Sequence, residues 1–302
     1  MEFKKLYSSI DAHAAGEAYR IVTQSPIRPV GRDIREKAAQ LSAGFRTEKN
    51  LLLNEPRGHR GMHGCIVTDS AGADAGLLFF VHDRVSTFKY EGVMAALTAL
   101  LETGNLAVAE TGEYTVDTVT GIHRVKADVS GDEVRAVQVE SRSAEVSGEP
   151  ERPSVRIDGE RDYLIYPLPA DIPAIELNHL AAIADWGLAK TRSLTDEKVP
   201  FTGVILVEKV ADGKVRTVTF EPDGYILRSP GADTTLALLA EQAKRTGAGT
   251  IENDSIFGSP LTAELTDGDR LAGTVRTEPF ITGTHDFVFD REDPLEQGFV
   301  IA

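Results

Sequence analysis

The sequence predicts an α/β protein made of two related halves, and three observations favour this fold class. Its 302 residues are enough for two domains of ordinary size. Short β-rich runs recur with turn residues between them, which indicates mixed sheets rather than a Rossmann series of alternating strands and helices. Two Ala- and Leu-rich helical segments, 92–102 and 234–245, each follow a β-rich run and end close to a glycine.

The individual elements follow from local patterns. The expected strands are Tyr19–Thr23, Cys65–Thr68, Leu77–His82, Tyr114–Val119, Val134–Ser141, Ser154–Ile157, Gly203–Val207, Lys214–Phe220, Arg270–Val275 and Phe287–Phe289. Helical spacing of apolar residues predicts Ile34–Gly44, Gly92–Glu102, Ala174–Trp186 and Thr234–Arg245. Because Ala- and Leu-rich helices that end in glycine are common, the likeness of two of them leaves internal duplication open. We expect the connection between the halves near Thr118–Gly121 and an exposed loop at Gly148–Pro153.

Composition limits the classes of function. Forty-seven acidic against 32 basic residues give a net charge of −15, which repels phosphate backbones and disfavours nucleic-acid binding. No stretch approaches the roughly 20 apolar residues of a membrane helix, and the first residues lack the apolar core of a signal peptide. We therefore expect a cytoplasmic protein.

The chain contains one cysteine, Cys65. A single thiol allows no internal disulfide, no thiolate zinc cluster and no paired-thiol chemistry within the chain. Cys65 begins an apolar run, so a buried small side chain at a strand is favoured over a nucleophile. His59 and His63 are four residues apart, but the glycines around them make a metal-binding helix improbable, and no phosphate-binding glycine motif is present. We expect neither a metal nor another cofactor.

The starts of the two similar helices are the candidate site. The first backbone N–H groups of a helix lack helical partners and carry the positive end of its dipole, so two such ends can hold a small carboxylate. Side chains at these two positions are Lys89, Tyr90 and Glu91, and Asp233, Thr234 and Thr235. Ordinary capping explains the second set better than a catalytic role does. Lys89 fits capping less well, since a cation is mildly unfavourable at this end of a helix.

Three motifs resemble the proline racemase family over nearly the whole chain. Ile10–Arg20 is similar to the family's Asp-x-His-Thr-Gly-Gly-Glu-Pro-x-Arg. Glu55–Met62 matches Glu-Pro-Arg-Gly-His-x-Asp-Met except for Gly61, and Asp290–Pro294 with Gly298 and Phe299 matches the family's ending. The resemblance implies the fold of diaminopimelate epimerase: two similar lobes, each a curved mixed sheet or barrel around a helix, with a cleft between them. The lobes would be residues 1–118 with 283–302, and 119–282.

The same resemblance implies a thiol at one helix N-terminus of each lobe, one removing the α-proton and the other returning a proton from the opposite face. Here both thiols are replaced. The family's Met-Cys-Gly-His-Gly aligns with Phe88–Gly92, so Lys89 and Glu91 stand where a cysteine and a histidine are expected. The second thiol becomes Gly231, and a substrate-binding aspartate becomes Leu227. A Gly-Gly-Asn motif is also missing near Arg161–Tyr163.

Two functional hypotheses remain. In the first, the protein is a divergent, cofactor-independent isomerase, epimerase or lyase of a small amino or hydroxy carboxylate. Lys89 is then the general base, with Glu91 or Asp233 as acid partner, and the substrate is bound at Tyr90, Gly92, Gly231, Ala232 and Thr234. In the second, it is a non-catalytic ligand-binding relative. Ordinary proline racemase or 4-hydroxyproline epimerase activity follows from family membership alone and conflicts with the missing thiols. A homodimer stays open.

Overall fold

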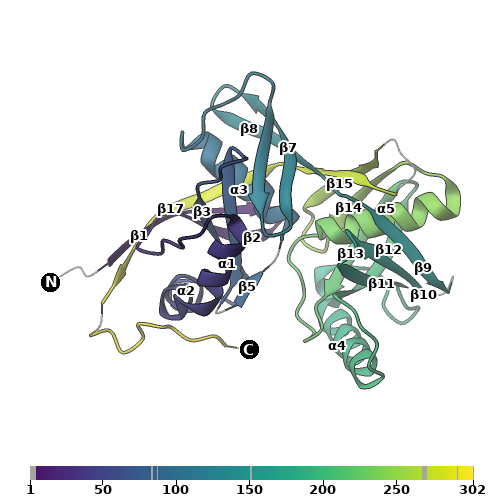
Figure 1. Cartoon of the computed structure of the whole chain (residues 1–302). Helices are drawn as coiled ribbons and strands as arrows, with labels where there is room; N and C mark the ends of the chain where they lie inside the picture. The colour runs from purple at the N-terminus through teal and green to yellow at the C-terminus, as the bar shows by residue number, and fades with distance from the viewer. Residues whose placement is uncertain are drawn as a thin grey trace. The chain divides into compact units, whose positions relative to one another are not determined.

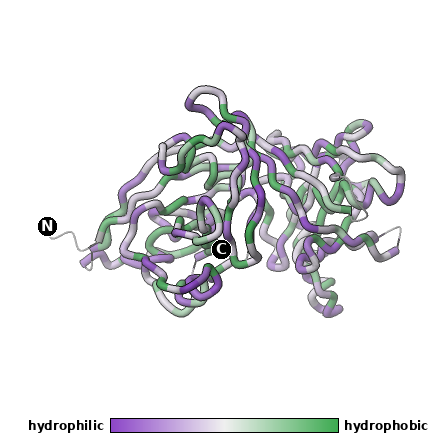
Figure 2. The backbone as a smooth tube through the Cα atoms, turned by 45° about the horizontal axis from the view of Figure 1, so that its top comes forward, coloured by the Kyte–Doolittle hydropathy of each residue, from purple (hydrophilic) through white to green (hydrophobic). Residues whose placement is uncertain are grey.

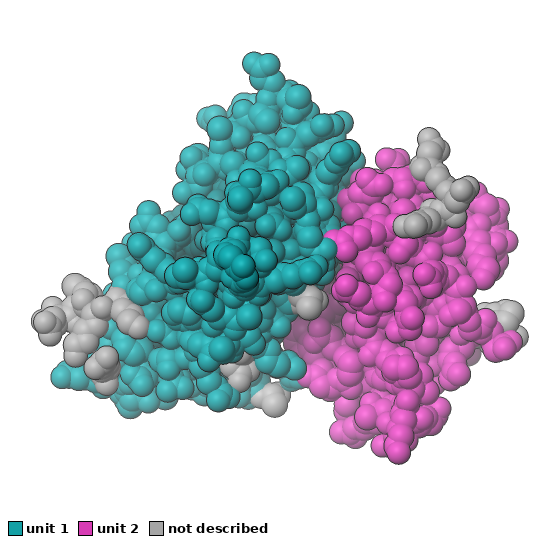
Figure 3. Space-filling model, viewed as in Figure 1, with its two compact units in different colours: residues 1–139, 278–302 teal, residues 140–277 magenta. Residues whose placement is uncertain are grey.

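The computed structural model describes residues 5–82, 84–86, 88–149, 152–266, 271–290 and 292–301. It contains two compact units, residues 1–139 with 278–302 and residues 140–277, which Figure 3 colours separately. The predicted division lay at 118/119 and 282/283. The observed first unit extends further because two antiparallel hairpins continue its sheet to Val139, and because the returning C-terminal strand begins at Pro279.

In the described part of the first unit, strands outnumber helices, as Figure 1 shows. Its helices are α1 (Ile34–Ala43), α2 (Arg46–Leu53) and α3 (Tyr90–Glu102). Its strands are β1 (Lys5–Ala14), β2 (Glu17–Gln24), β3 (Met62–Thr68), β4 (Ala75–Val81), β5 (Arg84–Ser86), β6 (Glu113–Thr118), β7 (Gly121–Ser130), β8 (Glu133–Glu140) and β17 (Pro279–Phe289).

The second unit has a similar content. Its helices are the short 3-10 helix η1 (Leu177–His179), α4 (Leu180–Asp196) and α5 (Ala232–Thr246). Its strands are β9 (Ala144–Glu149), β10 (Arg152–Ile157), β11 (Arg161–Pro167), β12 (Gly203–Ala211), β13 (Lys214–Phe220), β14 (Thr250–Ser255), β15 (Pro260–Leu265) and β16 (Gly273–Thr277).

The two units repeat one strand order. In the first, β17, β1, β2, β3, β4, β6, β7 and β8 pair in succession, with parallel pairing between β2 and β3 and between β4 and β6. In the second, β9 to β16 pair in succession, with parallel pairing between β11 and β12 and between β13 and β14. The parallel pairs occupy corresponding positions in the two series. In the first unit α3 lies in the connection between β4 and β6, and in the second unit α5 lies in the connection between β13 and β14. This repeated order supports the internal duplication that the sequence left open.

Each unit wraps its strands around one apolar helix. Every residue of α3 from Tyr90 to Leu101 is buried, as expected of a helix that is hydrophobic on all sides. α5 buries Ala232 and the run Thr234–Ala240, and keeps its last turn more exposed. The strands supply the rest of the core by alternation, which Figure 2 shows as repeated changes of hydropathy along the chain and which β7 illustrates in its burial pattern. The predicted mixed α/β fold with a helix inside each curved sheet is confirmed.

Two local predictions were wrong, and two others fall partly outside the described residues. The helix expected at Ala174–Trp186 is α4, which begins at Leu180 and continues to Asp196. The expected connection at Thr118–Gly121 is the tight turn between β6 and β7. The expected loop at Gly148–Pro153 is the end of the β9–β10 hairpin, whose residues 150 and 151 lie outside the described part of the chain, as does Arg270 of one expected strand.

Among the described residues, no helix combines the length and apolarity needed to cross a membrane.

Candidate active site

Lys89 stands immediately before α3. It has extended backbone angles, and its carbonyl accepts the first helical hydrogen bond, from the Val93 amide at 3.0 Å. Its side chain is half-buried and makes no capping hydrogen bond. Within the described residues, the Lys89 ammonium has neither a hydrogen-bond acceptor nor a carboxylate partner. A cation beside the free N–H groups of a buried helix is a place where an anion is stabilised.

Aromatic packing fixes the chain on both sides of Lys89. The buried ring of Phe88 meets the ring of Tyr90 edge to face at 4.7 Å and stacks on His123 at 4.3 Å. Tyr90 is 1% exposed and Glu91 8% exposed. Tyr90 therefore belongs to the core of the first unit, and Glu91 is a buried carboxyl group in the first turn of the helix.

Gly92 is required by close packing. A β-carbon at this position would lie 2.6 Å from Cε1 of Phe79 and 2.8 Å from Cε1 of Tyr19. Tyr19 in turn stacks on His63, whose Nε2 lies 2.7 Å from Oε1 of the buried Glu17. The first turn of α3 thus rests on an aromatic layer supported by a buried carboxylate–histidine pair.

Buried side chains of α5, β13 and β14 form hydrogen bonds with one another at the start of α5. Thr219 and Thr234 join their hydroxyl groups at 2.7 Å, and the Thr235 hydroxyl donates to the Gly231 carbonyl at 2.7 Å. The Asn253 amide donates to the Thr235 hydroxyl at 3.0 Å. Ala232, Thr234 and Thr235 are fully buried. These hydroxyl groups therefore stabilise the helix start internally.

Gly231 occupies a position that suits no other residue in the present arrangement. Its φ of +83° lies in the region that favours glycine, and an added β-carbon would lie 2.7 Å from Oγ1 and 3.0 Å from Cβ of Thr234. In the family pattern this position carries the second thiol. Here the space beside it is filled by the Thr234 side chain.

Asp233 is held by an arginine and a tyrosine. The guanidinium of Arg161 donates through Nε and Nη2 to the two carboxylate oxygens, both at 2.9 Å, and the Tyr163 hydroxyl donates to Oδ2 at 2.9 Å. Arg161 also donates to Asp158 at 2.8 Å. The Arg161 side chain is 12% exposed and that of Asp233 20% exposed, so this pair is largely shielded from water. Sequence reasoning missed the contact, although it noted the altered segment Arg161–Tyr163.

The three sequence motifs meet in one structural cluster of the first unit. Arg20 donates two hydrogen bonds to the Asp11 carboxylate, at 2.9 and 2.6 Å, and others to the carbonyls of Leu52 and Arg57. Arg57 forms an ion pair with Asp293. These buried contacts join residues far apart in the sequence, so the motifs secure the fold around α3.

The predicted side chains thus fall into two groups. Lys89, Tyr90, Glu91 and Gly92 form the start of α3, while Gly231, Ala232, Asp233 and Thr234 form the start of α5.

Cys65 lies in β3 and is completely buried, as favoured from the sequence. Burial in apolar surroundings raises the pKa of its thiol, which opposes a nucleophilic role. His63 is in the same strand rather than on a helix. In the described part of the chain, no cluster of three or more histidine, cysteine and acidic side chains has the geometry of a metal site.

Comparisons with known proteins agree with this architecture. A family model described as proline racemase matches residues 9–150. A trans-3-hydroxy-L-proline dehydratase from Bacillus cereus is 30% identical over 335 aligned residues that cover both chains completely. The structure of a probable proline racemase from Agrobacterium radiobacter, with bound carbonate, has a TM-score of 0.83 and 20% identity over 98% of this chain and 96% of that chain.

A hydroxyproline epimerase from Agrobacterium vitis, with bound trans-4-hydroxy-L-proline, has a TM-score of 0.82 and 22% identity, covering 100% of this chain and 96% of that chain. These two structures establish the shared fold. The matching family model and the 30% identity to the dehydratase over the full length of both chains show that this protein belongs to the proline racemase family.

Proposed function

We propose that this protein is a one-base lyase that acts on a small carboxylate bearing a β-hydroxyl group. The observation that carries the proposal is the contrast between the two helix starts. Lys89 presents a half-buried amine with no hydrogen bond or ion pair in the described chain, whereas Gly231 presents no side chain at all. Racemisation by two groups needs a proton donor at each position, but elimination needs one base.

Carboxylate binding is assigned to the start of α3. Its first backbone N–H groups and the positive helix end favour a negatively charged group. Negative charge develops on the substrate carboxylate as the α-proton is removed. Stabilisation of this charge by the start of α3 makes the proton easier to remove. The relative from Bacillus cereus is named for a β-hydroxylated substrate, trans-3-hydroxy-L-proline. Because Leu227 stands in place of the aspartate expected to hold a ring amine, we assign a β-hydroxy carboxylate without committing to a ring.

In the proposed reaction, Lys89 acts as the base that removes the α-proton. The electrons of the Cα–H bond form the Cα–Cβ double bond, and the Cβ–O bond breaks. The resulting Lys89 ammonium returns the same proton to the leaving oxygen, which departs as water. No oxidant or reductant is needed. Glu91 is buried in the first turn of α3 and forms no ion pair with Lys89, so no step of the reaction is assigned to it.

Asp233 was the other candidate acid. Both of its oxygens accept hydrogen bonds from Arg161, and Oδ2 accepts a third from Tyr163, so both oxygens of this carboxylate are engaged within the second unit. We therefore assign Asp233 to stabilising the start of α5 and leave proton transfer to Lys89.

The test is proton nuclear magnetic resonance in D₂O with trans-3-hydroxy-L-proline, trans-4-hydroxy-L-proline, L-proline and open-chain β-hydroxy acids. Loss of the α-proton with release of water, and no stereoinversion, is the expected result. Lys89→Gln is expected to reduce turnover by at least about a hundredfold, as removal of a general base does. Lys126→Gln, at an exposed lysine of the same unit, is the control. Stereoinversion of L-proline, or full turnover by Lys89→Gln, would exclude the one-base assignment.

A second candidate function is ligand binding without catalysis. It is favoured by the hydroxyl groups at the start of α5, which are buried and are hydrogen-bonded to one another, to Asn253 and to the Gly231 carbonyl. In this case the same carboxylates raise the thermal midpoint of the protein, yet none exchanges its α-proton with D₂O. Binding with exchange supports the lyase instead.

A further inference from the structure

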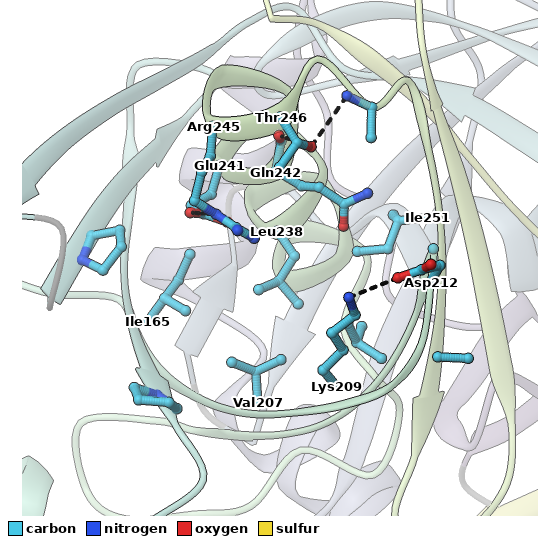
Figure 4. Close-up of a pocket in the computed structure, with 16 residues that line it drawn as sticks. Ile165, Val207, Lys209, Asp212, Leu238, Glu241, Gln242, Arg245, Thr246 and Ile251 are labelled. Carbon is cyan, nitrogen blue, oxygen red and sulfur yellow. Dashed lines mark hydrogen bonds and ion pairs between the residues drawn. The ribbon is translucent and has the colours of Figure 1, made fainter.

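The second unit contains a cavity of about 580 Å³ between α5 and the strands of its own sheet (Figure 4). This volume lies within the range of small-molecule sites in proteins, which is roughly 300–1,000 Å³. The lining comes from β10, β11, β12, β13 and β14, from the second half of α5 and from the segment that follows it. All of it belongs to one compact unit.

The cavity is distinct from the candidate active site. α5 contributes Leu238, Glu241, Gln242 and Arg245, whose spacing of three and four residues places them on one face of the helix. None of the residues at the start of α5 lines it. Arg245 is twelve residues after Asp233, a distance of about 18 Å along a helix that rises 1.5 Å per residue.

The floor of the cavity is aliphatic. Figure 4 shows Ile165, Val207, Leu238 and Ile251 directed toward the same space, and Val215 also lines it. Ile165 and Leu238 are each 5% exposed and Ile251 is 3% exposed, so these side chains are fixed by packing. An apolar group with the size of a leucine or phenylalanine side chain is the kind of structure that such a floor accepts.

The mouth carries charges of both signs. Arg245 donates through Nε to Glu241 at 2.9 Å, and Lys209 pairs with Asp212 at 2.7 Å. Within the described residues, the two Nη groups of Arg245 make no hydrogen bond, which leaves an edge of the guanidinium that fits a carboxylate. Asp212 is fully exposed in the turn between β12 and β13, and Thr246, the last residue of α5, lines the same cavity, so the negative end of this helix also favours an ammonium group.

From this floor and mouth we infer a second ligand site, which takes a zwitterionic amino acid with a large apolar side chain. The apolar side chain lies on the aliphatic floor, the carboxylate meets Arg245, and the ammonium group lies toward Asp212 and the end of α5. The exposed ion pair of Lys209 and Asp212 is weak enough to rearrange around the ligand. This inference is independent of the proposed reaction, because it concerns binding at the other end of α5.

The experiment is isothermal titration calorimetry of the full chain with L-phenylalanine. L-Alanine, phenylalaninamide and 3-phenylpropionate lack the apolar body, the carboxylate and the ammonium group, respectively. Saturable binding of L-phenylalanine, at least about tenfold tighter than that of each analogue, supports the site. Absence of heat with up to about 10 mM L-phenylalanine, or equal binding of 3-phenylpropionate, overturns it.

Two variants locate the binding. Ala248→Trp places an indole at the lining of the cavity from a half-buried loop position and is expected to abolish binding. Arg245→Gln removes an exposed guanidinium. It is expected to weaken the binding of L-phenylalanine by about tenfold and the binding of phenylalaninamide by less. The matched controls are Ala182→Trp and Arg192→Gln at exposed positions of α4. Binding by Ala248→Trp that equals the unmodified protein would place the ligand elsewhere and contradict the inference.

Discussion

A β-carbon at Gly231 would lie 2.7 Å from Oγ1 of Thr234, so the side chain of the second residue fills the space that a side chain of the first would need. The family motif Asp-Arg-Ser-Pro-Cys-Gly-Thr-Gly-Thr, which Leu227–Thr235 resembles, has a cysteine at the position of Gly231 and a glycine at the position of Thr234. The two changes are therefore complementary in space. The Thr234 hydroxyl also forms a hydrogen bond with the Thr219 hydroxyl, which holds the Thr234 side chain beside Gly231.

Restoring the thiol alone should therefore destabilise the protein. Gly231→Cys is expected to cost about 1–3 kcal/mol, because it introduces overlap with Thr234 at a backbone conformation that favours glycine. In the double variant Gly231→Cys, Thr234→Gly, the loss should be smaller than the sum of the single losses by about 1 kcal/mol. Urea unfolding measures this coupling. Gly44→Cys, where the nearest atom is 3.4 Å from the added β-carbon and φ is extended, is the control. Additive losses would show that the two positions are not complementary.

The pair of Arg161 and Asp233 should stabilise the second unit. Asp233→Asn removes the charge that two guanidinium hydrogen bonds and a tyrosine hydroxyl stabilise, and it leaves the largely buried Arg161 with one fewer carboxylate partner beside Asp158. We expect a loss of about 2 kcal/mol in the free energy of unfolding. Asp212→Asn, in a fully exposed ion pair, should change the free energy of unfolding far less. Equal effects of the two variants in chemical denaturation would contradict the structural role of Asp233.

Gly92→Ala tests the packing under α3. Alanine ordinarily stabilises a helix relative to glycine by about 1 kcal/mol. Here its β-carbon would overlap the rings of Phe79 and Tyr19, so we expect a net destabilisation of about 1–3 kcal/mol. Gly249→Ala, where no atom lies within 4 Å of the added carbon, should show no such loss. A rise in the thermal midpoint of the Gly92 variant would contradict this prediction, because it would show that the rings of Phe79 and Tyr19 move aside at little cost.

His13 should make stability depend on pH. Burial lowers the pKa of His13 below its ordinary value of 6.5, and its Nδ1 accepts a hydrogen bond from the Gly16 amide, which requires an unprotonated nitrogen. The unfolded chain therefore binds a proton more readily, so this contribution is complete above about pH 6.5 and is lost as the pH falls.

Urea unfolding between pH 7.5 and 5 should show a smaller decline for His13→Gln than for the unmodified protein. Burial also lowers the pKa of His82, but that residue is present in both proteins and adds the same slope to each. Parallel curves for the two proteins would remove His13 as a source of the pH dependence.

The sequence predicted the central helices well and their surroundings less well. Apolar residues at helical spacing placed α3 and α5 within two residues of their observed bounds, because both helices are buried and carry a strong pattern. The helix predicted from Ala174 was placed too early, because Ile172 and Ile175 are buried in irregular backbone and imitate helical spacing. The strands β1 and β17 carry serine, threonine and histidine among their apolar residues, so alternation defines them poorly.

The candidate site shows a similar limit. Lys89, Glu91 and Asp233 could be identified as unusual residues at two helix starts from motif alignment alone. The contact between Arg161 and Asp233 joins residues 72 positions apart, and no local pattern reports it. The packing of Thr234 beside Gly231 likewise depends on a backbone conformation that sequence spacing does not reveal.

The pairing of β17 with β1 has a consequence for how the chain folds during synthesis. Residues 140–277 form a continuous unit whose strands pair in chain order, so they can complete their sheet as they leave the ribosome. The earlier unit cannot, because β1 remains an open edge until β17 has been translated and lies along it from Lys5 to Ala14. The part of the protein that is made first is therefore the part that matures last.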